Sequence, residues 1–340
     1  MKKLFVISNE SVLNYEGKFF CDNIDTKIIS EGLNSQFQIN LIARKSKIKR
    51  SHRININNIK IYSTILTFLL GIYKTFKETE ESKYLIISIT PFTFLASVLI
   101  KIFKKKSSIY LRSDGYGEYK SIFGFIGPVI YHFMFNIVTN IMPLISCRTY
   151  ILKGKKGDII SPSLITKNWI VDKNDAQTNK VNLLYIGRLK IEKGIFSFLK
   201  ILKESNNNQT LTIIGSEKNS LNKVNQRNVT VHEIVNDEKE LINIYDNHNI
   251  FILPSFTEGH PMVLLEALAR LRPVIIFPEI EHVIGDKKGI FVAERNPKNF
   301  FEQTNYIIQN YKSIQNEMKK NQLPTKDEFL QEFGKLIFKI

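Results

Sequence analysis

Residues 254–274 read PSFTEGHPMVLLEALARLRPV, and this stretch decides the fold of the C-terminal half of the chain. It follows an apolar run that ends at Leu253, and a second apolar run begins at Val274. A strand, a loop, a helix and a strand in this order predict a unit with parallel strands. Pro261 suits the first turn of the helix, so the amides of residues 259–263 other than this proline should point toward an anion at its positive end.

Two carboxylates stand close to the start of this predicted helix. Glu258 lies in the loop before it, and Glu266 lies more than one turn inside it, among apolar residues. A carboxylate on an apolar strip needs a partner. It could bind a buried backbone group or an arginine, or it could accept hydrogen bonds from the two adjacent hydroxyl groups of a ribose. The same ligand would be lined by Gly259, His260, Pro261, Met262 and Val263, although His260 could equally be a residue that only fills the loop.

A second loop of this kind follows the predicted strand 181–186. It reads GRLKIEKG over residues 187–194, and a helix is expected directly after it. Gly187 allows a ligand to approach the backbone, while Arg188 and Lys193 place two cations at the end of the strand. Two cations suit a diphosphate, although the same residues could be a solvated loop. Because ligands bind beyond the carboxyl ends of parallel strands, we expect both loops to contribute to one site.

Together the two loops resemble the donor domain of the large GT-B glycosyltransferase family often numbered four, the group 1 type. Its motifs run G-R-x-x-x-x-K-G and P-S-x-x-E-G-x-P-x-x-x-x-E-A-x-A-x-x-x-P-V, and they stand here as GRLKIEKG and PSFTEGHPMVLLEALARLRPV. The resemblance extends from Leu183 to about Val292. Two positions depart from the family pattern: Asn249 replaces a usual Asp, and Leu271 replaces a usual Gly.

The resemblance implies roles for these residues. Arg188 and Lys193 would hold the donor diphosphate and stabilise the charge that grows as the sugar leaves. Glu258 would contact the transferred sugar, and Glu266 would bind the ribose. Members of the family retain the anomeric configuration, and many need no metal or other cofactor. The chain fits this expectation, because its six histidines form no cluster with metal-ligand spacing.

The first half of the chain offers weaker candidates for the acceptor side. Family members often have a glycine-rich loop after the first strand, where this chain has Gly17, and a histidine after a later strand. Here the apolar run 109–111 is followed by RSDGYG, in which Arg112 and Asp114 could face an acceptor. A structural Asp-Gly turn would explain the same residues.

The whole chain is long enough for two domains of about 150 residues. Alternating β-branched runs and helical patterns in both halves predict two doubly wound, parallel-sheet, Rossmann-like domains, which in the GT-B fold face a cleft. The expected organisation is an acceptor domain over residues 1–160, a hinge over 161–180, a donor domain over 181–322, and a last helix over 323–340 that returns to the first domain.

Positive charge is concentrated in the first half. The formal net charge is +16, and residues 1–160 carry 24 Lys and Arg against 11 Asp and Glu, whereas residues 161–340 carry 24 against 21. Such a field attracts nucleic acid, an anionic membrane or a phosphorylated substrate. The apolar segment 122–146 is interrupted by glycine, proline and polar residues, so we expect helices that pack in the domain and contact a bilayer surface rather than span it. His132 in this segment is expected to be buried and hydrogen bonded.

These observations predict a hexosyltransferase-type enzyme. It would move a sugar from a nucleotide-diphosphate sugar, with a UDP-sugar favoured, to a glycan or lipid-diphosphate-linked acceptor during synthesis of a bacterial surface polysaccharide such as O-antigen or capsule. Two cysteines without CxxC spacing and a short first apolar run favour a cytoplasmic protein, peripheral at the inner face of the membrane.

Two kinds of alternative function are considered. A nucleotide-sugar epimerase or a sugar-phosphate synthase would have the same fold, whereas a basic nucleic-acid-binding protein would belong to another class. We expect no nucleic-acid partner, because no basic-aromatic module is present.

Overall fold

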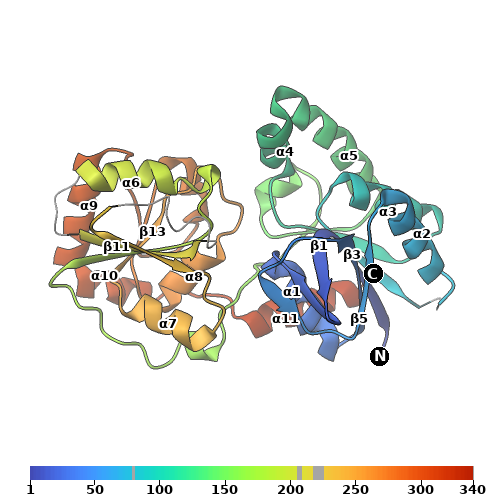
Figure 1. Ribbon diagram of the computed structural model, residues 1–340, viewed down its shortest axis with the longest axis horizontal. Helices are drawn as coiled ribbons and strands as arrows, with labels where there is room; N and C mark the ends of the chain where they lie inside the picture. The colour runs from blue at the N-terminus through green and yellow to red at the C-terminus, as the bar shows by residue number, and fades with distance from the viewer. Residues whose placement is uncertain (79–80, 205–208, 217–225, 340) are drawn as a thin grey trace. The chain divides into compact units, whose positions relative to one another are not determined.

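The computed structural model describes residues 1–340 except 79–80, 205–208, 217–225 and 340. The chain divides into two compact units (Figure 1): unit 1 is formed by Met1–Ser161 and Asp327–Ile340, and unit 2 by Pro162–Lys326. The sheet of each unit is built mainly from parallel strands and is covered by helices. The predicted α/β class with two doubly wound domains is therefore confirmed.

In unit 1 the parallel strands follow the order β5-β3-β1-β6-β7-β8-β9. Their bounds are β1 (Lys3–Tyr15), β3 (Gln38–Lys45), β5 (Asn58–Tyr62), β6 (Lys83–Ile87), β7 (Ser107–Leu111), β8 (Leu144–Ser146) and β9 (Asp158–Ile159). Every residue of β6 and β7 is buried, as expected for strands covered on both faces. The covering helices include α1 (Ile24–Gly32), α2 (Ile65–Thr75), α3 (Pro91–Ile102) and α11 (Lys326–Phe338).

An antiparallel extension of this sheet was not predicted. Strand β1 extends beyond the short first apolar run to Tyr15 and turns back into β2 (Lys18–Cys21). Strand β2 pairs in turn with β4 (His52–Ile54). The turn is tight because Glu16 and Gly17 both have positive φ, at 50° and 76°. Such φ values are typical of two-residue hairpin loops.

Helices α4 (Gly115–Phe123) and α5 (Gly127–Ile141) form a hairpin after β7 (Figure 1). The rings of Tyr119 and Tyr131 pack between them, 5.2 Å apart. The prediction that His132 is buried is wrong. It lies on the outer face of α5, where its ring nitrogens are each 2.8 Å from a partner, the Tyr116 hydroxyl and the Asn136 amide nitrogen.

Unit 2 contains a parallel sheet in the order β12-β11-β10-β13-β14-β15. Its strands are β10 (Val181–Ile186), β11 (Gln209–Ser216), β12 (Val229–Glu233), β13 (Ile250–Leu253), β14 (Val274–Ile276) and β15 (Ile290–Val292). Its helices are α6 (Ile195–Glu204), α7 (Glu238–Asp246), α8 (Met262–Ala269), α9 (Pro297–Gln309) and α10 (Tyr311–Met318). The strand order proceeds outward from β10 in one direction and from β13 in the other. The point between these two strands is where such sheets bind ligands.

The segment 161–180, predicted as a hinge, packs into unit 2 instead. Trp169 is buried in the core of this unit, and the guanidinium of Arg270 donates to the carbonyls of Trp169 at 3.1 Å, Val171 at 2.8 Å and Asp172 at 2.9 Å. The chain therefore leaves unit 1 at Ser161 and enters unit 2 at once. It returns at Asp327, and α11 packs within unit 1, where the Phe333 ring lies 5.0 Å from that of Tyr110.

Candidate active site

Two loops follow the strands at the switch point of unit 2. Residues 187–194 follow β10 and residues 254–261 follow β13, and these strands are parallel neighbours. Their carboxyl ends therefore meet at one edge of the sheet. The loops also touch directly, because the Phe256 amide donates to the Glu192 carbonyl at 3.0 Å.

Lys193 and Glu258 form the polar centre of these loops. The Lys193 ammonium donates to the Glu258 carboxylate at 2.7 Å, and the same carboxylate oxygen accepts from the Ser255 hydroxyl at 2.6 Å. The lysine side chain is 25% exposed and that of the glutamate 10%. The structure thus brings together two residues that lie 65 positions apart and leaves the cation accessible to a ligand.

Glycines allow the two loops to approach so closely. Gly194 has a φ of 66°, and a side chain on it would clash with the Pro254 carbonyl. A Cβ on Gly187 would lie 2.7 Å from the Tyr185 hydroxyl, which donates to the Arg188 carbonyl at 2.9 Å. Both glycines of the GRLKIEKG motif are therefore required by the geometry of the loop. Arg188 itself is exposed in the same loop.

Arg295 supports the second loop, and the sequence analysis did not identify it. Its guanidinium donates to the Pro254 carbonyl at 2.8 Å and stacks on the Phe256 ring, 4.1 Å from the ring centroid. It also donates to the Glu279 carboxylate at 2.6 Å. These contacts hold the backbone that precedes Glu258, so Arg295 is a positioning residue. It lies outside both motifs, and no local pattern could have identified it.

The residues after Glu258 lead into α8. The His260 ring nitrogen Nε2 lies 2.8 Å from the Pro162 carbonyl, and the ring of His282 contacts the Glu258 carbonyl at 2.8 Å. Pro261 was predicted to lie in the first turn of the helix. In the structure it is the N-cap residue, and α8 begins after it, at Met262. The first amides of a helix, here those of Met262 and Val263, have no carbonyl of the preceding turn to bind and are suited to an anion.

Glu266 is buried on α8, with 3% of its surface exposed. The Tyr245 hydroxyl from α7 donates to its carboxylate at 2.9 Å. Burial raises the pKa of Glu266 to about 7, and the bond from Tyr245 opposes this shift. Among the residues that the structure describes, Glu266 is therefore hydrogen bonded to α7 through Tyr245, whereas Glu258 is paired with Lys193. A carboxyl group with a pKa this close to neutrality can change its charge when a ligand binds.

The three predicted acceptor-side residues all make contacts that stabilise unit 1. Gly17 occupies the hairpin turn between β1 and β2, and its amide donates to the Asn14 side chain at 3.2 Å. Arg112 binds the Asp25 carboxylate at 2.8 Å. Asp114 accepts from the Tyr116 amide at the start of α4, at 3.1 Å, and pairs with Lys153. Asp114 therefore has a structural role, but as the N-cap of α4 rather than in the Asp-Gly turn considered as the alternative. A role in acceptor binding stays a prediction.

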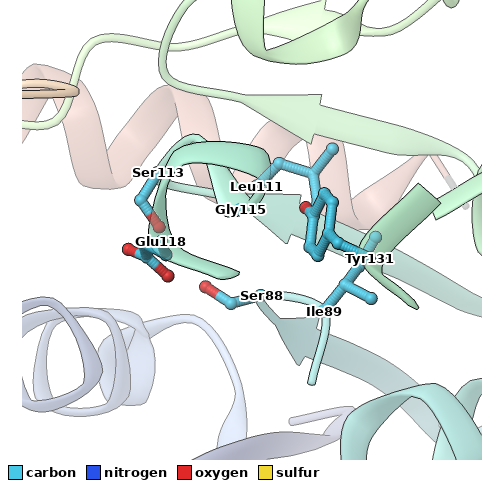
Figure 2. A pocket seen from close by; sticks show the side chains of 7 residues that line it. All are labelled: Ser88, Ile89, Leu111, Ser113, Gly115, Glu118 and Tyr131. Atoms are coloured by element: carbon cyan, nitrogen blue, oxygen red, sulfur yellow. The ribbon is translucent and has the colours of Figure 1, made fainter. Parts of the chain in front are cut away.

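A small hollow lies beside these residues, at the carboxyl ends of β6 and β7 (Figure 2). The side chains of Ser88, Ser113 and Glu118 converge on it, and Tyr131 and Ile89 form an apolar wall. Ser88 has a positive φ of 61°, which is a strained backbone conformation for a serine. This strain and the converging polar groups make the hollow a candidate for a ligand contact within unit 1.

Over the part of the chain that the structure describes, no group of three or more His, Cys, Asp or Glu side chains could hold a metal ion. The described loops carry the cations Arg188, Lys190 and Lys193, of which Arg188 and Lys193 were predicted to bind the donor. Whether the reaction needs a metal stays a prediction, which activity measurements with and without a chelator would test.

Comparisons with known proteins indicate a family that the chain resembles. Residues 167–323 match the family Glycosyl transferases group 1, which covers both loops. An uncharacterized glycosyltransferase of Haemophilus influenzae is 29% identical over 42% of this chain and 43% of its own length. An uncharacterized 41.2 kDa protein in the cps region of Klebsiella pneumoniae is 26% identical over 74% of this chain and 67% of its own. The capsular polysaccharide biosynthesis glycosyltransferase CapM of Staphylococcus aureus is 28% identical over 36% of each chain. The chain thus spans less than half the length of two of these relatives in the matched regions.

A likeness to solved structures extends over the whole chain. HepE of Anabaena, solved in complex with UDP-glucose, aligns with a TM-score of 0.71 over 99% of this chain and 100% of its own, at 11% identity. At this identity the likeness establishes the fold alone.

Proposed function

We propose that this chain, a GT-B-fold glycosyltransferase of the group 1 family, transfers a sugar from a UDP-sugar to a hydroxyl group of a glycan or lipid-linked acceptor. The observation that carries the proposal is the Lys193–Glu258 pair at the switch point of unit 2, beside Arg188 and the first turn of α8. Cations and helix amides suit a diphosphate, and carboxylates suit the hydroxyl groups of a sugar and a ribose. The solved complex of HepE with UDP-glucose supports the choice of a UDP-sugar.

In the proposed reaction the bond between the anomeric carbon and the β-phosphate oxygen breaks, and its electron pair stays on UDP. Arg188 and Lys193 stabilise the negative charge that grows on the diphosphate. The acceptor hydroxyl oxygen bonds to the anomeric carbon, and its proton passes to the departing phosphate oxygen. Approach of the acceptor from the face that UDP leaves gives retention of configuration. Glu258 orients the transferred sugar while its carboxylate remains paired with Lys193.

The acceptor side is assigned to unit 1, where the hollow lined by Ser88, Ser113 and Glu118 can bind hydroxyl groups. Relatives named for capsule synthesis or encoded in a capsule region support a bacterial surface polysaccharide, of the O-antigen or capsule type, as the product. Unit 1 carries the excess of Lys and Arg, which favours a lipid-diphosphate-linked acceptor and a cytoplasmic enzyme at the inner face of the membrane.

Calorimetric titration of the purified chain with UDP, GDP, dTDP and CMP tests the donor. We expect UDP to bind most tightly, and the absence of binding by all four nucleotides would contradict the proposal. The product of a reaction with a UDP-sugar then separates the alternatives. Transfer to a glycan or lipid-linked acceptor supports the glycosyltransferase, whereas an isomerised UDP-sugar or a free sugar phosphate would indicate an epimerase or a sugar-phosphate synthase.

Glu266 provides a second test within the same titration. A carboxylate that binds the ribose hydroxyls contributes about 1.5–3 kcal/mol, so Glu266→Ala should weaken UDP binding by about tenfold or more. The pKa of Glu266 is about 7. At about one pH unit below this value, only about one tenth of the free protein has the Glu266 carboxylate ionised. Wild-type affinity should therefore rise by about tenfold between pH 6 and pH 8.

Glu266→Gln is the matched control for this pH dependence. It keeps the size of the side chain and cannot ionise, so only the titration of the UDP phosphate, near pH 6, should remain. The same raised pKa predicts that Glu266 lowers the free energy of unfolding as the pH rises from about 4.5 to about 7, since the folded state holds the proton more tightly. An unchanged UDP affinity in Glu266→Ala would remove this residue from the donor site.

A further inference from the structure

Three helices of unit 1 are apolar on the side that faces away from the sheet. Leu70 and Tyr73 on α2, Phe103 at the end of α3, and Val129 and Phe133 on α5 are all exposed. Phe125, in the turn between α4 and α5, is 87% exposed. We call these six residues the apolar surface. A helix at the surface of a globular domain normally carries polar residues on its outer side, so this pattern needs an explanation.

Ring contacts connect the neighbouring helices that carry the apolar surface. The Tyr73 ring on α2 lies 5.2 Å from that of Phe103, next to α3, and the Phe94 ring on α3 lies 6.0 Å from that of Phe133 on α5. Helices α2, α3 and α5 follow one another across unit 1 (Figure 1). The inner sides of the same helices are already used, because residues such as Phe68, Ile100 and Val138 are buried in the core.

Basic residues predominate on the helices that carry the apolar surface, although α4 also carries the exposed Glu118. Helices α2, α3 and α5 contain no Asp or Glu, and neither do the longer segments 82–113 and 119–157. Lys74 follows Tyr73, Lys101 precedes Ile102 and Phe103, and Lys120 lies on α4; all three lysines are exposed. Long basic side chains beside an apolar face are the pattern of a protein that lies on an anionic membrane.

A membrane-spanning helix does not fit this part of the chain. Residues Gly115–Ile141 are long and apolar enough to cross a bilayer by composition. They are divided, however, by Gly124 with a φ of 61°, and α4 packs back on α5 through Tyr116 and Tyr131, whose rings are 4.9 Å apart. The fifteen residues of α5 extend over about 22 Å, less than the roughly 30 Å of a hydrocarbon core.

We propose that the apolar surface docks unit 1 on the interface of an anionic phospholipid bilayer. The outer sides of α2, α3 and the α4–α5 hairpin lie at the boundary between headgroups and acyl chains, and Lys74, Lys101 and Lys120 reach the lipid phosphates. The proposed function includes a location at the membrane, and this inference names the residues that would bind the lipid there. It does not depend on which reaction the chain catalyses. A second copy of the chain is a poorer occupant, because a symmetric contact would place the lysines of one copy close to those of the other.

Flotation of the purified full-length chain with vesicles tests the proposal. One set contains phosphatidylcholine alone and the other an equimolar mixture with phosphatidylglycerol. We expect the wild-type chain to float with the anionic vesicles. The triple variant Phe125→Ser, Val129→Ser, Phe133→Ser should bind about tenfold more weakly or worse. Lys74→Gln with Lys101→Gln should weaken binding to the anionic vesicles by about tenfold, and added salt should reduce the difference from wild type.

Matched controls change equally exposed residues outside the apolar surface. Ile48→Ser in unit 1, where Ile48 is 70% exposed, and Lys298→Gln with Lys312→Gln in unit 2 should leave flotation unchanged. UDP affinity and the melting temperature, measured on every variant, separate this test from that of the donor site. Equal flotation of wild type and triple variant, or no flotation of the wild type, overturns the proposal. So does a wild-type dimer, seen by light scattering, that the triple substitution converts to a monomer.

Discussion

Replacing Lys193 by methionine should lower kcat by about 10²- to 10³-fold and change the affinity for UDP far less. Methionine keeps much of the length of the side chain and removes the charge that lies 2.7 Å from Glu258. In the proposed ground-state complex the diphosphate also has the α8 amides and Arg188 as partners. In the transition state additional negative charge accumulates on the leaving oxygen. The loss of a cation should therefore raise the energy of the transition state more than that of the bound donor. The kinetic constants with a UDP-sugar and a direct titration with UDP measure the two effects.

Lys190→Met is the matched control for this prediction. Lys190 lies in the same loop, is exposed, and makes only a 4.0 Å ion pair with Glu192. An exposed pair of this kind contributes little, so kcat should stay close to the wild-type value. A loss of UDP affinity with an unchanged kcat in Lys193→Met would mean that Lys193 only binds the donor. A lowered melting temperature in this variant would show instead that the pair with Glu258 holds the loops together.

The donor loops could be predicted from the sequence because each consists of neighbouring residues with a local cause. Gly194 is required by the close approach of the Pro254 backbone, and Gly187 by that of the Tyr185 hydroxyl. A strand followed by a proline-containing helix start places residues 254–261 at the edge of the sheet. The contact between Lys193 and Glu258 follows once β10 and β13 are neighbours. Neither loop alone indicates that these two strands are neighbours. This pairing was expected from the strand order of doubly wound sheets.

The departures from the family pattern have structural explanations. Leu271 stands where a glycine is usual, and its φ of 55° is the left-handed conformation that a glycine would adopt without strain. Asn249 stands where an aspartate is usual. Its amide nitrogen donates to the carbonyls of Gln177 and Lys180, at 2.9 and 2.5 Å, which a carboxylate could not do. Both residues lie outside the two loops of the candidate site.

Long-range contacts account for what the sequence did not predict. The antiparallel strands β2 and β4 are three or four residues long, too short for a clear alternation of apolar and polar residues. Arg295 acts on a loop that lies about 40 residues earlier in the chain. The polar segment 161–180 has the composition of a linker, but its backbone carbonyls are bound by arginines that lie about 100 residues later. Composition alone cannot identify such partners.

Replacing Arg270 by methionine should lower the free energy of unfolding of unit 2 by about 3–5 kcal/mol. The guanidinium binds both oxygens of the Asp246 carboxylate, at 2.9 and 2.6 Å, and donates to the carbonyls of Trp169, Val171 and Asp172. Both side chains of the ion pair are almost fully buried. Methionine fills much of the volume, but it leaves the Asp246 carboxylate with Arg272 as its remaining guanidinium partner, at 3.4 Å, and three carbonyls without this donor.

Urea denaturation followed by the fluorescence of Trp169 measures this effect in the correct unit, because Trp169 is the single tryptophan of the chain and lies in the core of unit 2. Lys320→Met is the matched control: its ammonium pairs with Glu317 at the same distance of 2.6 Å, but both side chains are more than half exposed. Water screens that pair, so its loss should leave the free energy of unfolding close to the wild-type value. If both substitutions had the same small effect, the Arg270–Asp246 pair would not hold residues 169–172 in unit 2, and this segment would act as the hinge that its composition predicted.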